Sequence, residues 1–235
     1  MSFKRKVILF LIITISFNMS ASHKIYVIHG HGGNRLLMHK LAKNIQNAGY
    51  ETENFGYPSF TEDIVHVSER LFRKITTDNY DTISFVTHSM GALIVRNLYK
   101  LIQDSTDFPV INKIVMIAPP NKGTPVADFF YPCKICRFLL GVNYVHLTTN
   151  DNTGLNSLPI PDCEIGLILG IWGKKHGYNP FLKSDSDGYI LPERAILGVE
   201  KDIAYVKAGH TSLTQKKKVS QLAVNFLKYS NFSLK

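Results

Sequence analysis

Hydrophobic positions along this chain alternate between short apolar runs and longer stretches with a spacing of three or four residues. A short apolar run between turns predicts a buried strand, whereas the wider spacing predicts one face of an amphipathic helix. Strands are therefore predicted at Ile25–Ile28, Ile83–Val86, Lys113–Ile117, Ile165–Ile171 and Ile203–Val206, and a further strand is expected near Glu51–Tyr57, between the first two helices. The helical spacing occurs at Leu37, Leu41, Ile45 and Ala48, at Ile64, Leu71 and Ile75, across Met90–Leu101, and at Val219, Leu222, Ala223, Phe226 and Leu227.

Two helix ends carry sequence signals of their own. Gly49 follows the first predicted helix, and glycine tolerates the left-handed conformation that ends many helices. Thr61 precedes Glu62 and Asp63. A hydroxyl cap followed by acidic residues suits the positive end of a helix, so we expect the second helix to begin at Thr61.

Strands that alternate with helices, each strand apolar along its length, indicate a parallel sheet covered on both faces. We therefore predict an α/β fold, a three-layer α/β/α sandwich with a mostly parallel six-stranded sheet, over residues 23–235. Residues 124–160 differ, because they are aromatic, contain proline and lack a clear period. We expect this segment to be a loop-like insertion over the sheet edge, either a mobile lid or a segment that only packs against the sheet.

The first 22 residues have the layout of a secretory signal peptide. Lys4, Arg5 and Lys6 precede an apolar run over Val7–Phe17, and small residues follow at positions 20–22. This run is well short of the roughly 20 residues that a membrane-spanning helix needs. We therefore predict a cleaved leader over residues 1–22 and a secreted or periplasmic protein. The alternative is an uncleaved anchor or a first helix.

The charge balance does not favour a nucleic-acid partner. The 235 residues carry 27 Lys and Arg against 18 Asp and Glu, a net charge of +9. Losing the three basic residues of the leader lowers the net charge to +6, and the remaining cations are scattered. The exception is Lys216–Lys218, which we expect to face solvent near the start of the last helix or to contact an anionic membrane surface transiently.

Three cysteines, Cys133, Cys136 and Cys163, follow the predicted leader. In an exported protein an odd number suggests one disulfide and one spare thiol. Cys133 and Cys136 form a C-x-x-C pair, which fits a local bridge, a redox pair or half of a zinc site. No second ligand pair follows at zinc-finger spacing, so a structural or incidental role is favoured, with Cys133 or Cys136 bridged to Cys163.

The sharpest chemical signal is the segment Ser84–Ala92, where a predicted strand runs directly into a helix with Ser89 between them. Such a turn lifts a serine hydroxyl clear of the sheet and requires small neighbours two residues before and after. Gly91 satisfies this pattern, whereas Thr87 stands where glycine is usual. The alternative is that Ser89 only caps the helix; we favour a nucleophile at a helix N-terminus, where N–H groups stabilise an oxyanion.

A second signal follows the first strand, in the segment His29-Gly30-His31-Gly32-Gly33. Acyl transfer needs two backbone N–H donors aimed at the developing oxyanion. Met90, directly after the serine, is expected to supply one, and His31 the other, because glycines let this backbone approach closely. A phosphate-binding loop or a metal site built on the two histidines ranks lower. The loop lacks a Walker-type lysine, and no third metal ligand lies nearby.

Together these motifs resemble the α/β-hydrolase superfamily, in particular small bacterial lipases and GPI inositol-deacylase-like proteins. The segment Ile117–Asp128 is similar to a "PN.GT..AD" stretch of such lipases. Asp187-Gly188-Tyr189 and Gly209-His210-Thr211 resemble the acid and base signatures, so the order Ser, Asp, His matches the family over nearly the whole chain.

This resemblance implies a triad of Ser89, Asp187 and His210. A serine hydroxyl needs a base within hydrogen-bond reach, and a carboxylate must orient that base. Asp185 is the alternative acid, and His146 and His176 are alternative bases; Gly188 favours Asp187 because it completes the signature. His29 and His88 are expected to pack or to orient loops.

The predicted function is an exported serine hydrolase that cleaves carboxylic esters, of lipid or acyl type, through an acyl-enzyme. No metal and no cofactor is expected, and the partner is a small-molecule or lipid ester. The alternatives are an amide- or head-group-directed deacylase or acyltransferase with the same triad, and a binding protein that retains the scaffold without catalysis.

Overall fold

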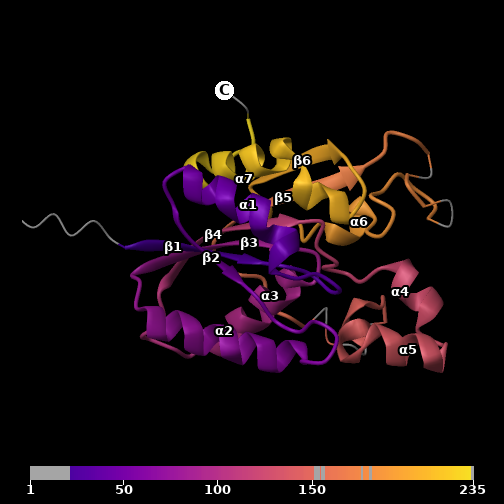
Figure 1. The fold of residues 1–235 in the computed structure, drawn as a ribbon, viewed down its shortest axis with the longest axis horizontal. Coiled ribbons are helices and arrows are strands. Elements are labelled where there is room, and N and C mark those ends of the chain that lie inside the picture. Colours follow the sequence, from indigo (N-terminus) through magenta and orange to yellow (C-terminus); the bar gives the residue numbers. More distant parts are fainter. Residues whose placement is uncertain (1–21, 151–153, 155–156, 176, 180–181, 234–235) are drawn as a thin grey trace, which may run out of the picture.

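Six parallel strands form the central layer of the computed structural model (Figure 1). The model describes residues 22–150, 154, 157–175, 177–179 and 182–233. The strands lie in the order β2-β1-β3-β4-β5-β6, and every neighbouring pair is parallel. Their bounds are β1 His23–Ile28, β2 Glu51–Phe55, β3 Thr82–His88, β4 Val110–Ile117, β5 Glu164–Ile171 and β6 Asp202–Lys207. All six predicted strands are therefore confirmed.

Four long helices cover the two faces of the sheet. They are α1 Arg35–Asn47, α2 Ile64–Asp78, α3 Gly91–Ile102 and α7 Lys217–Tyr229. Helices α1 and α7 lie on one face, and α2 and α3 lie on the other (Figure 1). The short helix α6, Pro192–Ala195, precedes β6. This arrangement confirms the predicted three-layer α/β/α sandwich, in which parallel strands are buried from both sides.

The ends of α1 and α2 show which cap signals operate. Gly49 follows α1 with a φ of +94°, the left-handed conformation expected there. The second helix does not begin at Thr61. Its cap is Asp63, whose carboxylate accepts a hydrogen bond from the Val65 N–H at 2.8 Å, so the helix begins at Ile64. Both residues carry a capping oxygen, and the sequence alone does not decide between them.

The segment predicted to be loop-like, residues 124–160, contains helices where the structure describes it. They are α4 Pro125–Phe130, α5 Lys134–Leu140 and the 3₁₀ helix η1 Val142–Leu147. These helices lie beyond the carboxyl ends of the strands (Figure 1). No residue of α5 is buried. Helices of six or seven residues give too short a pattern to be told from a loop in the sequence, which explains the wrong prediction.

Arg96, on α3, holds both ends of this inserted segment. Its side chain is buried and donates hydrogen bonds to the carbonyl oxygens of Leu158 at 2.5 Å, Pro159 at 3.3 Å and Asn121 at 3.4 Å. Burial lowers the pKa of Arg96 to about 10. A buried cation is stable only when its donors are satisfied, so three backbone carbonyls are fixed around this one side chain.

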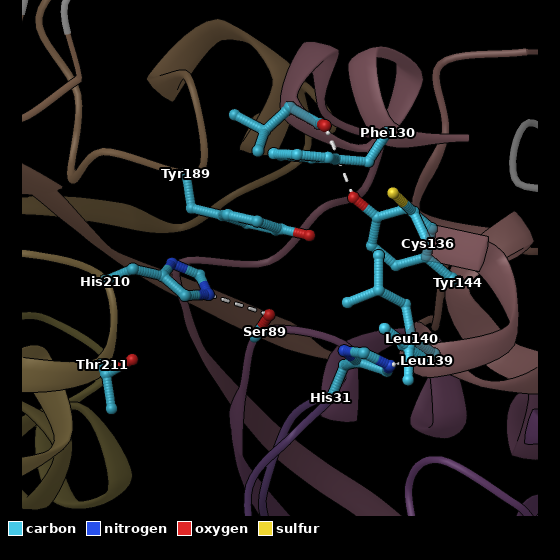
Figure 2. A pocket seen from close by; sticks show the side chains of 11 residues that line it. His31, Ser89, Phe130, Cys136, Leu139, Leu140, Tyr144, Tyr189, His210 and Thr211 are labelled. Carbon is cyan, nitrogen blue, oxygen red and sulfur yellow. Dashed lines mark hydrogen bonds between the residues drawn. The ribbon is translucent and has the colours of Figure 1, made fainter. Parts of the chain in front are cut away.

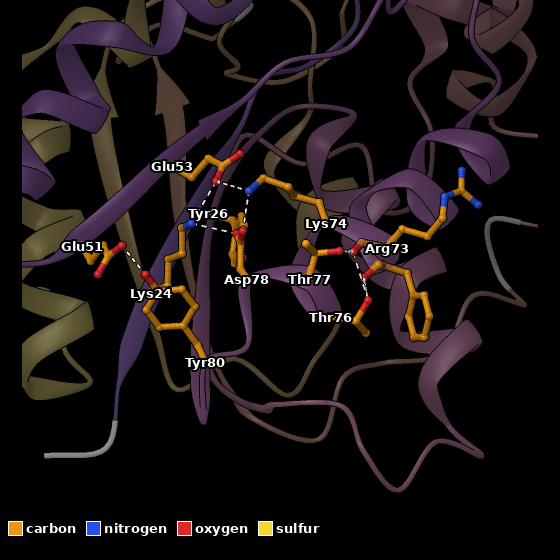
Figure 3. A network of polar contacts seen from close by, with 11 residues as sticks. Lys24, Tyr26, Glu51, Glu53, Arg73, Lys74, Thr76, Thr77, Asp78 and Tyr80 are labelled. Atoms are coloured by element: carbon orange, nitrogen blue, oxygen red, sulfur yellow. Dashed lines mark hydrogen bonds and ion pairs between the residues drawn. The ribbon is translucent and has the colours of Figure 1, made fainter. Parts of the chain in front are cut away.

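A network of charged groups lies at the opposite end of the sheet (Figure 3). Asp78 accepts hydrogen bonds from Lys24 at 2.7 Å, Lys74 at 2.5 Å and Tyr26 at 2.6 Å. Glu53 also pairs with both lysines. Burial alone would raise the pKa of Asp78, but its donors hold the pKa well below the usual value. The network ties α2 to β1 and β2, remote from the carboxyl ends of the strands.

The three cysteines are free thiols. The bridge favoured by the sequence, from Cys133 or Cys136 to Cys163, is therefore wrong. Cys163 directly precedes β5, whereas Cys133 and Cys136 flank the start of α5, beyond the carboxyl ends of the strands. An eight-residue strand is about 26 Å long. A disulfide requires Cα atoms roughly 4.4–6.8 Å apart, so this pairing is out of reach.

The predicted leader lies outside the described residues, except for Ser22. Within the described ranges, none of the helices is long and apolar enough to cross a bilayer.

Candidate active site

Ser89 occupies a sharp turn between β3 and α3. Its φ is +51°, in the left-handed region that residues other than glycine rarely adopt. The Ser89 N–H donates to the Ile117 carbonyl at 2.9 Å, which fixes the turn to the end of β4. Such a conformation costs about 1–2 kcal/mol and persists where the surrounding structure imposes it. The predicted strand-to-helix turn with serine at its centre is present.

Two glycines allow the backbone to close around this turn. A Cβ atom on Gly30 would lie 2.6 Å from Ser89 Cβ, and one on Gly91 would lie 2.7 Å from the Ile28 carbonyl oxygen. Any side chain at either position would collide with backbone or with the serine. The loop after β1 and the turn after β3 are consequently in direct contact.

Thr87, the departure from the usual glycine pattern, fits without disturbing the turn. It is fully buried near the end of β3, and its hydroxyl donates to the Val115 carbonyl on β4 at 3.5 Å. The hydroxyl is thus satisfied by the neighbouring strand rather than directed at Ser89. A threonine is tolerated here because the residue still belongs to the strand.

His210 lies between Ser89 and Asp187, and Figure 2 shows its imidazole directed at the Ser89 hydroxyl. Its Nε2 is 3.0 Å from Ser89 Oγ, and its Nδ1 is 2.7 Å from Asp187 Oδ2. An ionised carboxylate only accepts hydrogen bonds, so Nδ1 carries the proton and Nε2 is left to accept the serine O–H. The structure brings together the three residues that the sequence assigned to the triad.

The Asp187 carboxylate is fixed by backbone donors. Its Oδ1 accepts the N–H groups of Tyr189 at 2.9 Å and Ile190 at 2.7 Å. The His210 N–H donates to the Asp187 carbonyl at 2.9 Å, which joins the two loops directly. The Asp187 side chain is only 1% exposed. A buried carboxylate held in this way stays oriented toward the imidazole.

The alternative acid has another role. Asp185 accepts the N–H groups of Trp172 at 2.8 Å and Gly173 at 2.7 Å, so its carboxylate caps the chain where it leaves β5.

The alternative base His146 lies in η1, 3.4 Å from Asp63, in contact with the cap of α2 rather than with Ser89. The other alternative, His176, lies outside the described residues. Across the described ranges, no group of three or more His, Cys, Asp or Glu side chains is arranged to hold a metal ion.

His88 and His29 support the two loops, in line with the expected packing roles. His88 Nε2 donates to the His210 carbonyl at 3.1 Å, and burial together with the nearby His210 lowers the pKa of His88 to about 3. His29 stacks on Tyr57 with ring centroids 4.1 Å apart, and burial lowers its pKa as well. Both rings are therefore neutral near pH 7.

The two expected oxyanion donors, His31 and Met90, flank Ser89. Met90 immediately precedes the first residue of α3, and the first N–H groups of a helix have no acceptor within it. His31 follows Gly30, the residue in contact with Ser89. The His31 side chain has a further contact: its Nε2 donates to the Leu140 carbonyl at 2.6 Å, at the end of α5.

A cavity of about 480 Å³ opens at Ser89 (Figure 2). Its walls are mostly apolar and come from the β1 loop, the inserted helices and the loops that carry Asp187 and His210. The lining residues are His31, Ser89, Val126, Phe130, Cys136, Leu139, Leu140, Tyr144, Tyr189, His210 and Thr211. The insertion therefore forms a wall of the cavity.

Two site residues were missed in the sequence. The Tyr189 ring packs against His210 with centroids 5.1 Å apart, and burial raises the pKa of its hydroxyl. Thr124, which caps α4, donates to the Tyr189 carbonyl at 2.5 Å and so joins the insertion to the loop of Asp187. Thr124 belongs to the "PN.GT..AD" stretch and Tyr189 to the acid signature, so both stood in motifs already identified.

Comparison with solved structures identifies relatives of the fold. The chain is similar to the lipase BlEst2 of Bacillus licheniformis in its mature form, with a TM-score of 0.66, 16% identity, and 88% of this chain and 91% of that one covered. It is also similar to the metagenomic carboxyl esterase MGS0156 (TM-score 0.65, 16% identity, coverage 83% and 66%). Aspergillus fumigatus lipase B gives a TM-score of 0.66 at 13% identity, with coverage of 92% and 55%.

These likenesses establish the α/β-hydrolase fold that the motifs suggested. No curated protein matches the sequence. A family model described as "Domain of unknown function (DUF7379)" matches residues 23–142, just over half of the chain, including β1 through β4 and the Ser89 turn. The chain therefore belongs to the DUF7379 family and has the α/β-hydrolase fold.

Proposed function

We propose that this protein is a serine hydrolase of small-lipase type that cleaves carboxylic esters with an apolar acyl group. The observation that carries the proposal is the hydrogen-bonded chain from Ser89 through His210 to Asp187, which opens on an apolar cavity. Base and nucleophile lie within hydrogen-bond reach, and a third group orients the base, as covalent catalysis requires.

In the proposed first half-reaction, Ser89 Oγ attacks the ester carbonyl carbon while His210 Nε2 takes the hydroxyl proton. Asp187 stabilises the imidazolium that forms. The N–H groups of Met90 and His31 donate to the oxyanion of the tetrahedral intermediate. Its collapse breaks the bond to the alcohol, which leaves with the proton from His210, and the acyl group remains on Ser89.

The second half-reaction uses the same residues. Water enters, His210 takes one of its protons, and the resulting nucleophile attacks the acyl-enzyme carbonyl. Collapse returns the proton to Ser89 Oγ and releases the carboxylic acid. Each oxyanion donor contributes roughly 3–4 kcal/mol in comparable enzymes, so both backbone positions matter.

Labelling with a fluorophosphonate tests the nucleophile. The full chain should be modified at Ser89, and the label should be absent in Ser89→Ala. Ser212→Ala is the matched control, because Ser212 is exposed two residues after His210 and donates only to the Gly209 carbonyl. A folded protein that neither reacts with the probe nor hydrolyses esters would instead be a binding protein on this scaffold.

The cavity walls support an apolar acyl group. Val126, Phe130 and Leu140 face the space in front of Ser89. With p-nitrophenyl esters of graded chain length, kcat/KM should rise from acetate to a longer optimum, because each methylene placed in an apolar pocket adds about 0.8 kcal/mol. Equal kcat/KM values from acetate to palmitate would show that the cavity does not bind the acyl chain. Activity confined to amides or lipid head groups would favour a deacylase.

The surface around the cavity supports a lipid as the source of that ester. Phe138 is 85% exposed and Ile135 is 73% exposed, both on α5, while Lys134 and Arg137 supply positive charge beside them. Transient contact with an anionic membrane is part of the proposal. Sedimentation with vesicles containing phosphatidylglycerol should fall in Phe138→Asp and be unchanged in Leu101→Asp, an exposed position on α3.

Export through the residue 1–22 leader also remains a proposal. Sequencing the N-terminus of the protein recovered from a secreting host tests it, and a mature chain that starts near His23 is expected.

A further inference from the structure

Two cysteines share the first turn of α5 at the cavity wall. Cys133 caps the helix, and its sulfur accepts a hydrogen bond from the Cys136 N–H at 3.2 Å. Cys136 lines the cavity that also contains Ser89 and His210 (Figure 2). The ester hydrolysis proposed above uses neither thiol.

The spacing of the two residues suits a disulfide. Residues three apart on a helical turn have Cα atoms about 5 Å apart, within the usual range for a disulfide. The Cys136 thiol donates to the Cys133 sulfur, and this hydrogen bond lowers the pKa of Cys133. Cys133 is exposed. The pair therefore combines an accessible sulfur with a lowered pKa and a second thiol hydrogen-bonded to it.

Cys163 has the opposite character. Burial raises its pKa to about 12, and it directly precedes β5, about one strand length from α5. A half-buried thiol with a raised pKa reacts slowly in exchange, because the thiolate is the attacking species. Cys163 therefore serves as an internal comparison for the reactivity of the other two thiols.

We propose that Cys133 and Cys136 form a thiol–disulfide exchange site, and that a small-molecule disulfide such as oxidised glutathione switches the cavity wall through it. The Cys133 thiolate attacks one glutathione sulfur, the glutathione S–S bond breaks, and one glutathione leaves as a thiolate. Cys136, after losing its proton, attacks the Cys133 sulfur and displaces the second glutathione. The two cysteines lose two electrons and two protons, which the two glutathione thiols gain.

The wall is connected to this pair through α5. None of its residues is buried, so the first turn has room to adjust when the bridge forms. Leu139 and Leu140 on the same helix line the cavity, and the Leu140 carbonyl accepts the His31 side chain next to the serine. The effect on substrate choice rests on the proposed ester hydrolysis, whereas the disulfide itself does not.

Mass spectrometry of the full chain tests the bridge. The protein is equilibrated in glutathione buffers of graded redox ratio, quenched in acid, alkylated and digested with trypsin. Lys134 lies between the two cysteines, so trypsin separates them into two peptides that stay joined only if the bridge is present. The expected result, with alkylation carried out on the unfolded chain, is a joined pair with Cys163 alkylated.

Three variants sharpen this test. Cys136→Ser should accumulate glutathione on Cys133, Cys133→Ser should form no bridge, and Cys163→Ser should behave as the unmodified protein. Full alkylation of both thiols in the most oxidising buffer would overturn the proposal, and so would a bridge that includes Cys163.

Ester chain-length profiles test the coupling to the cavity. The ratio of kcat/KM for a long and a short ester should change by about tenfold between the reduced and the bridged protein, the effect of a methylene-sized change in an apolar pocket. Cys133→Ser, whose altered side chain does not line the cavity, should not respond. An unchanged ratio would overturn the proposed link between the disulfide and the cavity, while ester hydrolysis itself would stand. If no ester is hydrolysed, the proposed function is wrong, and mass spectrometry still measures the disulfide.

Discussion

The Gly30 backbone lies against the Ser89 side chain so closely that a Cβ atom on residue 30 would sit 2.9 Å from the His88 carbonyl and closer still to Ser89 Cβ. This contact sets the separation between the serine and the backbone of the following residue, His31. The proposed oxyanion site therefore depends on an absent side chain as well as on the donors themselves.

Gly30→Ala should consequently lower kcat by about 100-fold or more, the cost of displacing one oxyanion donor. Overpacking should also lower the free energy of unfolding by about 1–3 kcal/mol. Gly209→Ala is the matched control, because a Cβ atom there would meet its nearest neighbour at 3.6 Å. Ester hydrolysis rates and urea unfolding check both variants, and equal rates for the two would contradict this account.

Asp187→Asn and Asp185→Asn should separate the roles of two neighbouring carboxylates. The first leaves the imidazole of His210 without its anionic partner, so kcat should fall by about 10⁴-fold. The second weakens the cap on the chain after β5 and should cost about 1 kcal/mol of stability with kcat retained. Initial rates and thermal unfolding of both variants test these two roles. A larger loss of kcat in Asp185→Asn than in Asp187→Asn would refute the assignment of Asp187 as the carboxylate that orients His210.

His88 should make the fold sensitive to acid. Its folded pKa of about 3 lies below the ordinary value of 6.5, so only the unfolded chain binds this proton as the pH falls below about 6.5. The free energy of unfolding is therefore unaffected by His88 above that pH, and it falls progressively as the pH drops toward 3. At pH 5 the loss is about 2 kcal/mol.

Urea unfolding of His88→Gln measures this contribution. The glutamine side chain retains an N–H donor but does not titrate. Between pH 7.5 and pH 5 the variant should therefore lose about 2 kcal/mol less stability than the unmodified protein. His39→Gln, at an exposed position on α1, should follow the unmodified protein. Parallel pH profiles for His88→Gln and the unmodified protein would show that His88 is not the titrating group.

His31→Ala should loosen α5 while leaving the backbone donor of residue 31 in place. The Leu140 carbonyl loses its hydrogen bond, worth about 1 kcal/mol, so the amides of residues 134–140 should exchange faster with deuterium. A decrease of about fivefold to tenfold in kcat/KM should accompany this, because Leu139 and Leu140 line the cavity. His31→Gln retains a donor, so its exchange rates and kcat/KM should lie between those of the unmodified protein and of His31→Ala. Unchanged exchange in His31→Ala would show that this contact does not anchor α5.

The sheet was predictable because its chemistry is local in sequence. The central strands β3 and β5 are mostly apolar and buried on both faces, so they are recognisable without knowledge of their neighbours. The hydrogen-bonded arrangement of Ser89, His210 and Asp187 was predictable for a related reason. Ser89 and His210 follow directly or closely on strand ends, where a parallel fold collects its functional residues.

The helices of the inserted segment were not predicted, because α5 is only seven residues long. Ile135, Phe138 and Leu139 have helical spacing, but so short a run is ambiguous in the sequence. The contacts that position the segment were also hidden. Thr124 bonds to the backbone of Tyr189 and His31 to that of Leu140, and the backbone acceptor of such a bond leaves no trace in residue identity. These contacts are decided by tertiary geometry alone.

The guanidinium of Arg96 has a consequence for how this scaffold can diversify. Because one side chain of α3 holds carbonyls from both borders of the insertion, the distance between those borders is fixed by the core and not by the intervening residues. The segment between these borders can therefore be exchanged for another without moving them. Replacing the inserted segment with one of different length from a homologue should change which esters are hydrolysed, while the sheet and the Ser89 turn keep their structure.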